Sequence, residues 1–203
     1  MSRAPTRQGL ALLLALLLPA WVSANTPVEV VEKLQDALLA VMKDAGRLGY
    51  SGRYQRLEPV IRDSFDLPFI VRLAVGRYWQ DLSEAQQAQL VDTFTRLSVS
   101  TYAAQFDGYG GETFRVESRQ ALADGDVVVR AVLHDPDGDR TFFDYQLHRN
   151  GGDWRIVNII VDGISDLALK RAQYTATLRR QGFDALLARL AEKAASNAQT
   201  AAP

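Results

Sequence analysis

The first half of the chain repeats apolar residues with the period of an α-helix. Val31, Leu34 and Leu38 lie three or four positions apart with polar residues between them, which predicts an amphipathic helix over residues 26–45. Glycines between positions 46 and 52 interrupt this pattern. Helical spacing returns over residues 54–65 and predicts a second helix.

Two further helix starts are marked by their local sequence. A third helix is expected over residues 66–76, where Pro68 falls in the first turn, a position that proline favours. Ser83 and Gln86 have the spacing of a capping box at the head of a longer helix. The apolar stripe of that helix continues to Phe106.

Beyond Gly111 the period of the pattern changes to two, which is typical of strands. Short turns that contain glycine separate the runs, and glycine tolerates the positive φ that hairpin turns need. Four strands are therefore predicted, over residues 113–122, 126–134, 140–149 and 153–161. Consecutive hairpins place them in a four-stranded antiparallel meander.

Helical spacing returns after Gly163, breaks at Gly182 and resumes over residues 183–190. The last segment, residues 194–203, is small and polar, which predicts a disordered tail. Helices, a meander and further helices together indicate one α+β domain with N-terminal and C-terminal helices around the sheet.

The strand predicted over residues 153–161 is unusual because both of its faces are apolar. In strict alternation Trp154 and Ile156 point to one side, while Val157 and Ile159 point to the other. An antiparallel sheet usually leaves one face to water. Helices that cover both faces would explain the pattern, and so would an apolar ligand cavity against one face.

The N-terminal segment has the organisation of a secretory signal peptide. Arg3 and Arg7 precede an apolar run over residues 10–18, and a small-x-small pattern ends at Ala24. A membrane anchor is the alternative, but the run is shorter than a bilayer span of about 20 residues and Pro19 follows it. We expect residues 1–24 to be cleaved, leaving residues 25–193 as the folded domain in the periplasm. The chain has no cysteine, which excludes a lipidated cysteine and disulfides.

The net charge and the candidate catalytic or metal-binding residues exclude several kinds of function. Removing residues 1–24 takes away two arginines and no acid, so the net charge changes from −1 to −3 and nucleic acid is not an expected partner. His134 and His148 stand near strand ends without a nucleophile beside them. The acidic loop at 135–139 lacks the residue order of a calcium-binding EF-hand. We therefore expect no catalytic residues, no metal and no cofactor.

Several short motifs, taken in order, resemble one known family. They are Val75-Gly76-Arg77-Tyr78-Trp79, Ala85-Gln86 with Phe94-Thr95-Arg96 and Tyr102, Asp153-Trp154-Arg155 leading to Val161-Asp162-Gly163-Ile164-Ser165, and Leu178-Arg179-Arg180-Gln181-Gly182-Phe183-Asp184-Ala185-Leu186. From about residue 28 to 192 the chain resembles the periplasmic lipid-shuttle family of the Mla system substrate-binding component, also called toluene-tolerance proteins. That family includes a hopanoid-biosynthesis-associated branch.

The resemblance implies an NTF2-like α+β fold that encloses an apolar lipid cavity. It implies a soluble periplasmic carrier of phospholipid or hopanoid, and the motifs do not separate the two lipids. Its implied partners are an inner-membrane lipid transporter with a lipid-binding ring and an outer-membrane lipoprotein. The alternatives are an NTF2-like isomerase or dehydratase, which would need a residue such as Asp144 or His148 to point into the cavity, and a purely structural interaction domain.

Two sets of residues are predicted to carry this function. The cavity wall is expected to include Leu97, Tyr102, Val127, Val129, Phe142, Tyr145, Trp154, Ile156 and Ile159. Because a mature charge of −3 gives little attraction to anionic bilayers, docking on partner proteins is the favoured hypothesis. Arg77, Arg179 and Arg180 in the matched motifs are the candidates for docking at the cavity mouth.

Overall fold

The computed structural model describes residues 25–200, so the predicted signal peptide lies outside the described residues. The helical elements are α1 (Pro27–Lys43), α2 (Ala45–Ser64), α3 (Leu67–Val75), the 3₁₀ helix η1 (Gly76–Asp81), α4 (Glu84–Gln105) and α5 (Asp166–Thr200). The strands are β1 (Thr113–Ala121), β2 (Val127–His134), β3 (Arg140–Asn150), β4 (Asp153–Val161) and β5 (Ile164–Ser165). Within residues 25–200, no helix is both long and apolar enough to span a membrane.

The helix starts follow the capping rules that the sequence indicates. At α4 the predicted capping box is confirmed: Gln86 N donates to Ser83 Oγ at 3.3 Å, and Ser83 N donates to Gln86 Oε1 at 3.0 Å. Thr26 and Glu29 form a second capping box at α1. Each box satisfies two backbone donors that a helix start otherwise leaves unpaired.

The predicted α+β meander is confirmed, with one addition. The sheet has the order β1-β2-β3-β4-β5, and every neighbouring pair is antiparallel. The fifth strand has only two residues and pairs with the end of β4. It is too short to give a period in the sequence, which is why four strands were expected.

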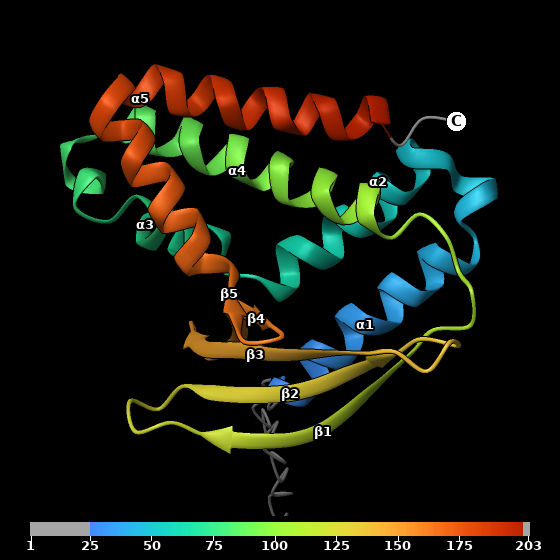
Figure 1. Ribbon diagram of the computed structural model, residues 1–203. Coiled ribbons are helices and arrows are strands. Elements are labelled where there is room, and N and C mark those ends of the chain that lie inside the picture. Colours follow the sequence, from blue (N-terminus) through green and yellow to red (C-terminus); the bar gives the residue numbers. More distant parts are fainter. Residues whose placement is uncertain (1–24, 201–203) are drawn as a thin grey trace, which may run out of the picture.

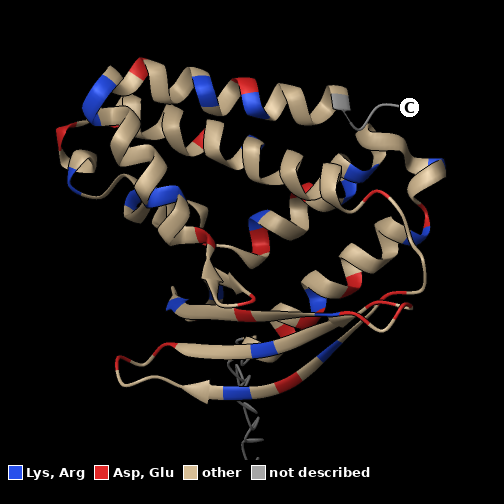
Figure 2. Cartoon of the chain, in the orientation of Figure 1, with Lys and Arg blue, Asp and Glu red and all other residues tan. Residues whose placement is uncertain are grey.

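The helices lie on one side of the sheet in two layers (Figure 1). α1 packs directly on β1, β2 and β4, and its residues Val31, Leu34 and Leu38 are buried. Above it, α4 packs on α2 and α5, and α3 packs on α5. Acidic and basic residues are mixed over the helices and strands, with neither sign confined to one layer (Figure 2). One continuous hydrophobic core therefore joins the sheet to the helices.

A β-bulge in β4 explains the apolar residues on both sides of that strand. Ile156 pairs with Leu147 and Ile159 pairs with Tyr145, so the register shifts by one residue at Val157. Cross-strand partners share a face of the sheet, so Ile156 and Ile159 both point toward the helices. Strict alternation placed them on opposite faces. Helices on both sides of the sheet are not needed to explain the pattern.

The C-terminal segment corrects the expectation of a disordered tail from residue 194. α5 continues to Thr200, and Asn197 is buried against α4. The amide of Asn197 donates to Ser100 Oγ at 3.1 Å and to Thr101 Oγ1 at 3.2 Å. Alanine favours helix, and a single polar residue that docks on a neighbouring helix does not appear as a hydrophobic period. Residues 201–203 lie outside the described part of the chain.

Candidate functional site

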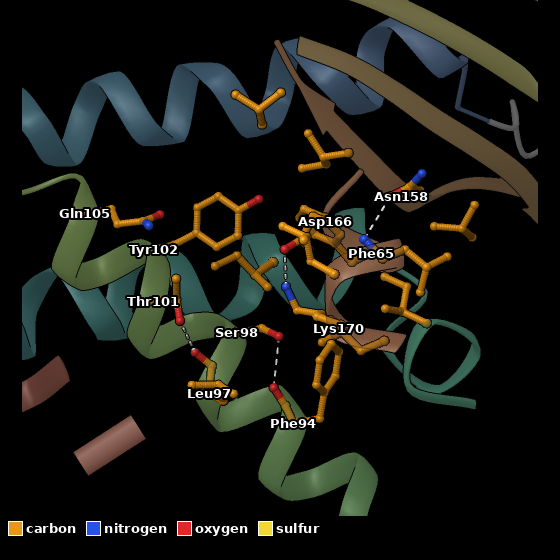
Figure 3. A pocket seen from close by; sticks show the side chains of 18 of the residues that line it. Phe65, Phe94, Leu97, Ser98, Thr101, Tyr102, Gln105, Asn158, Asp166 and Lys170 are labelled. Atoms are coloured by element: carbon orange, nitrogen blue, oxygen red, sulfur yellow. Dashed lines mark hydrogen bonds and ion pairs between the residues drawn. The ribbon is translucent and has the colours of Figure 1, made fainter. Parts of the chain in front are cut away.

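A pocket of about 430 Å³ lies between the sheet and the helices (Figure 3). Its walls come from α4, the α2–α3 junction, the start of β3, the second half of β4, and α5, mainly its first half. This volume is within the range of small-molecule sites in proteins, roughly 300–1,000 Å³. The pocket is therefore large enough to hold a ligand, or part of a longer one.

Most of the pocket wall is apolar. Its aliphatic and aromatic members are Ile61, Phe65, Leu67, Ile70, Phe94, Leu97, Tyr102, Phe106, Phe143, Val157, Ile159, Val161, Leu167, Leu169 and Tyr174. The serine and threonine hydroxyls on the α4 side are already bonded within their own helix. Ser98 donates to Phe94 O at 2.9 Å, and Thr101 donates to Leu97 O at 2.8 Å. The wall thus suits a hydrocarbon group better than a polar one.

Charged groups occur where α5 lines the pocket. Asp166 and Lys170 form an ion pair one helical turn apart, and Lys193 comes from the second half of α5. Asn158 holds the start of α5 in place, because its side-chain oxygen accepts from Leu167 N at 3.2 Å and from the Ser165 hydroxyl at 3.1 Å. The site therefore combines an apolar wall with a few fixed charges.

The tyrosines around the pocket are neutral over the physiological pH range. Desolvation by burial raises the pKa of Tyr102 well above its usual value, and the charges of Tyr145 and Asp166 add to this effect. Burial also raises the pKa of Tyr174, another lining residue. Tyr145 lies deeper in the core, where Gln35 Nε2 donates to its hydroxyl at 3.5 Å and burial raises its pKa to about 12. None of these phenols brings a negative charge to the pocket at neutral pH.

The structure brings three of the predicted wall residues to the pocket, namely Leu97, Tyr102 and Ile159. Five others share the inner face of the sheet but lie in the hydrophobic core outside the pocket lining: Val127, Val129, Tyr145, Trp154 and Ile156. The ninth, Phe142, pairs with Val132 on the outer face and is 38 % exposed. Of the nine, three are therefore placed to touch a ligand in this pocket.

The lining residues that the sequence analysis did not select come from both layers. Phe143 could have been predicted from the sequence, since it lies two residues before Tyr145 and so shares its face of β3. Val157 and Val161 were also predictable, because alternation places them on the same side of the strand as Ile159, which was selected. Phe65, which follows the end of α2, and Tyr174 of α5 are far apart in the chain, and their meeting depends on tertiary packing.

The predicted docking arginines lie away from this pocket. Arg77 and Arg179 line a second, smaller surface pocket between η1 and α5, and Arg180 does not line it. The residues of α5 that line the second pocket, Arg171 and Thr175 among them, are on the opposite face of the helix from Lys170 and Tyr174. The structure therefore separates these arginines from the apolar pocket by the thickness of one helix.

The two residues that would favour an enzyme are engaged elsewhere. Asp144 accepts from Arg130 Nε at 2.6 Å and Nη2 at 2.7 Å across the sheet. His148 bonds to the buried carboxylate of Asp66 at 2.8 Å. Neither lines the pocket, in which Asp166 is the only carboxylate among the described residues. Within residues 25–200, no group of acidic residues or histidines is placed to hold a metal ion.

The fold and the site define an α+β protein whose helices and antiparallel sheet enclose an apolar ligand pocket. A family model described as MlaC protein matches residues 32–192. The chain therefore belongs to the MlaC protein family, which confirms the resemblance drawn from the sequence motifs.

Two named relatives are similar over most of their length. The intermembrane phospholipid transport system binding protein MlaC of Haemophilus influenzae is 22% identical over 182 residues, which cover 85% of this chain and 84% of the relative. The toluene tolerance protein ttg2D of Pseudomonas putida is 26% identical over 183 residues, or 88% of this chain and 85% of the relative. Both names describe transport or tolerance functions rather than a catalysed reaction.

A solved structure of a phospholipid-binding protein from Ralstonia solanacearum shares the fold with a TM-score of 0.73 and 26% sequence identity. The match covers 83% of this chain and 97% of that one. The Ralstonia protein was solved in complex with a phospholipid.

Proposed function

We propose that this protein is a periplasmic phospholipid carrier that holds acyl chains in the pocket between its sheet and helices. The observation that carries the proposal is the apolar pocket of about 430 Å³, in a fold that the Ralstonia protein shares in complex with a phospholipid. The names of the relatives in Haemophilus and Ralstonia support the same cargo class.

The physical need for such a pocket follows from the cost of exposing hydrocarbon to water. Each buried CH₂ group is worth about 0.8 kcal/mol, so a 16-carbon tail in water costs on the order of 12 kcal/mol. A lipid leaves one bilayer for another only if a dry surface replaces its neighbours. The aliphatic and aromatic wall formed by α4, β4 and α5 provides such a surface.

The charged residues of the pocket fit a phosphate better than a second apolar group. Within residues 25–200, the lining contains two cations, Lys170 and Lys193, against the single carboxylate of Asp166. We place the anionic head group on this side of the pocket, where the ammonium groups of half-buried Lys170 and exposed Lys193 neutralise its charge. Such contacts select phosphate but not a particular head group.

The remaining parts of the proposal concern where the carrier works. Residues 1–24 direct export and are cleaved, and the chain from residue 25 through the end of α5 forms the lipid-binding domain. The protein exchanges lipid with an inner-membrane transporter on one side and an outer-membrane lipoprotein on the other. The arginines at 77, 179 and 180 remain the proposed docking residues.

Organic extraction of the protein purified from a lipid-containing host, followed by mass spectrometry, tests the cargo. Phospholipid is expected in near-stoichiometric amount, and a hopanoid in its place would correct the lipid class. A Ser98→Trp variant fills the pocket without adding charge, because Ser98 lines it. This variant is expected to carry severalfold less lipid than the wild type.

The matched control is Ser118→Trp, which adds the same side chain at an exposed position of β1. It is expected to keep the lipid content of the wild type, and circular dichroism checks that both variants fold. Absence of lipid from the wild type, or equal lipid content in Ser98→Trp, would refute a carrier that uses this pocket.

A further inference from the structure

Three arginines converge on the second pocket, a surface groove of about 400 Å³ between η1 and the first half of α5. They are Arg77 from η1 and Arg171 and Arg179 from α5, and Tyr78 and Thr175 lie beside them. Arg171, Thr175 and Arg179 are four residues apart, so they form one line along the helix. Basic segments appear on both η1 and this arm of α5 (Figure 2). Among the described residues, none that lines the groove carries a negative charge.

The three guanidinium groups are not neutralised by the described part of the chain. Four of the other eight arginines in the described helices form ion pairs, as Arg47 and Arg62 do with Asp44 and Glu58. The eight ion pairs within residues 25–200 include none of Arg77, Arg171 and Arg179. Asp81 acts on Arg77 only as a more distant charge. The groove therefore presents a local excess of positive charge on a chain whose net charge is −1.

Local backbone geometry brings two of these arginines together. Gly76 ends α3 with φ of +58°, a conformation that residues with a side chain rarely adopt. A Cβ at this position would lie 3.6 Å from Arg171 Nη2, so the guanidinium of α5 packs over the backbone of Gly76. Arg77 follows directly and stacks on Tyr78, with its Cζ 5.2 Å from the ring centroid. Both cations are thus held at the edge of one groove.

We infer that this groove binds an acidic segment of a partner protein, whose carboxylates pair with Arg77, Arg171 and Arg179. A groove receives a protruding chain, whereas a bilayer presents a broad plane, and the net negative charge of the whole chain opposes landing on anionic lipid. Guanidinium groups suit carboxylates because they donate two parallel hydrogen bonds. The docking role rests on the proposed exchange of cargo with partner complexes, but binding of an acidic chain here does not depend on lipid.

The groove also lies on the helix that forms one wall of the lipid pocket, so a partner bound in the groove can affect the bound lipid. The same arm of α5 carries the groove on one face and Lys170 and Tyr174 of the apolar pocket on the other. A partner segment seated on Arg171 and Arg179 would therefore contact the helix that forms one wall of the lipid site. This arrangement links partner recognition to the pocket through a single rigid element.

Fluorescence anisotropy with a labelled glutamate-rich peptide tests the inference on the full mature chain. Each exposed guanidinium–carboxylate contact is worth a factor of about two to five in affinity, so three contacts give about tenfold or more. The triple variant R77Q/R171Q/R179Q is expected to bind the peptide at least about tenfold more weakly than the wild type. A peptide with glutamine at every glutamate position is expected not to bind.

The control R115Q/R119Q/R140Q removes the same charge from exposed strand positions and is expected to leave peptide affinity within about twofold. An equal loss of peptide affinity in this control would mean that binding depends only on the net charge of the protein, and would refute a specific binding site at the groove. Displacement of the peptide by inorganic phosphate, or arginine-dependent binding to phosphatidylglycerol vesicles, would overturn the protein partner in favour of a phosphate ligand. Lipid content measured on the same triple variant is expected to stay at the wild-type level, which separates failure of this site from failure of the carrier function.

Discussion

At the scale of single residues, Phe142 and Phe143 show how one position along a strand changes the role of a side chain. Phe143 pairs with Val161, faces the helices, lines the pocket and stacks on Tyr145 with ring centroids 5.9 Å apart. Phe142 points to the outer face, where Arg140 lies over its ring at 5.6 Å. Two adjacent phenylalanines therefore belong to different surfaces of the protein.

This difference predicts opposite outcomes for two alanine substitutions. Phe143→Ala removes a packed ring and is expected to lower the free energy of unfolding by about 2–4 kcal/mol and to reduce the lipid content. Phe142→Ala is the matched control, with an expected loss below about 1 kcal/mol and unchanged lipid content. Urea unfolding followed by circular dichroism, together with mass spectrometry of extracted lipid, measures both. Equal losses for the two variants would show that the assignment of faces is wrong.

At the scale of elements, the bend of α5 divides one long helix into two arms with different partners (Figure 1). The first arm forms one wall of the pocket, and the second arm packs along α4, where Asn197 docks. The bend lies at Gly182, whose φ of 83° and ψ of −176° are outside the helical region. This combination of angles is essentially restricted to glycine. The predicted helix break at Gly182 is therefore confirmed as a bend.

Substitution of Gly182 by alanine tests whether this bend is required. The variant is expected to lose about 1–3 kcal/mol of unfolding free energy from backbone strain alone, since a Cβ there meets no atom within 4 Å. Gly46→Ala is the matched control: it also has open space around the new Cβ but no positive φ, so it is expected to be neutral or slightly stabilising. Thermal and urea denaturation compare the two. A neutral Gly182→Ala would mean that α5 can straighten.

At the scale of the whole molecule, the pocket exists because the two layers meet only along part of their surface. α1 fills the space over β1 and β2, while the start of β3 and the second half of β4 face α4 and α5 across the pocket. The α2–α3 junction closes one side through Asp66, which bonds to His148 at 2.8 Å and accepts from Asn150 at 2.7 Å. Burial in this region extends to Tyr102, Tyr145 and Tyr174, each of which has a raised pKa.

These buried tyrosines predict how stability depends on alkaline pH. Above about pH 10 the unfolded chain loses tyrosine protons that the folded protein retains, so the free energy of unfolding falls as pH rises. Each such tyrosine contributes about 1.4 kcal/mol per pH unit, and for Tyr145 the fall ends near its folded pKa of about 12. Urea midpoints between pH 9 and about 12 measure the slope. Tyr145→Phe is expected to have a shallower slope than the wild type, and an identical slope would contradict the assigned burial.

The class of fold and the positions of most elements follow from local patterns in the amino-acid sequence. Helical and two-residue periods locate the helices and four strands, because they record which side of each element avoids water. Short-range signals such as the Ser83 capping box and Gly182 mark helix starts and bends, since their effects act within a few residues. The ordered motifs also indicated the family that the comparison with known proteins confirmed.

Only the tertiary structure decided which apolar residues form the pocket. The bulge at Val157 changes the face of every later residue in β4, and it depends on the register with β3. Leu97 and Ile159 meet across the pocket although they are far apart in the chain, as do Arg77 and Arg171 at the groove. A buried core residue and a pocket residue have the same sequence signature, because both are apolar and both avoid water. What separates them is whether another layer fills the space beside them, which is a property of packing rather than of local sequence.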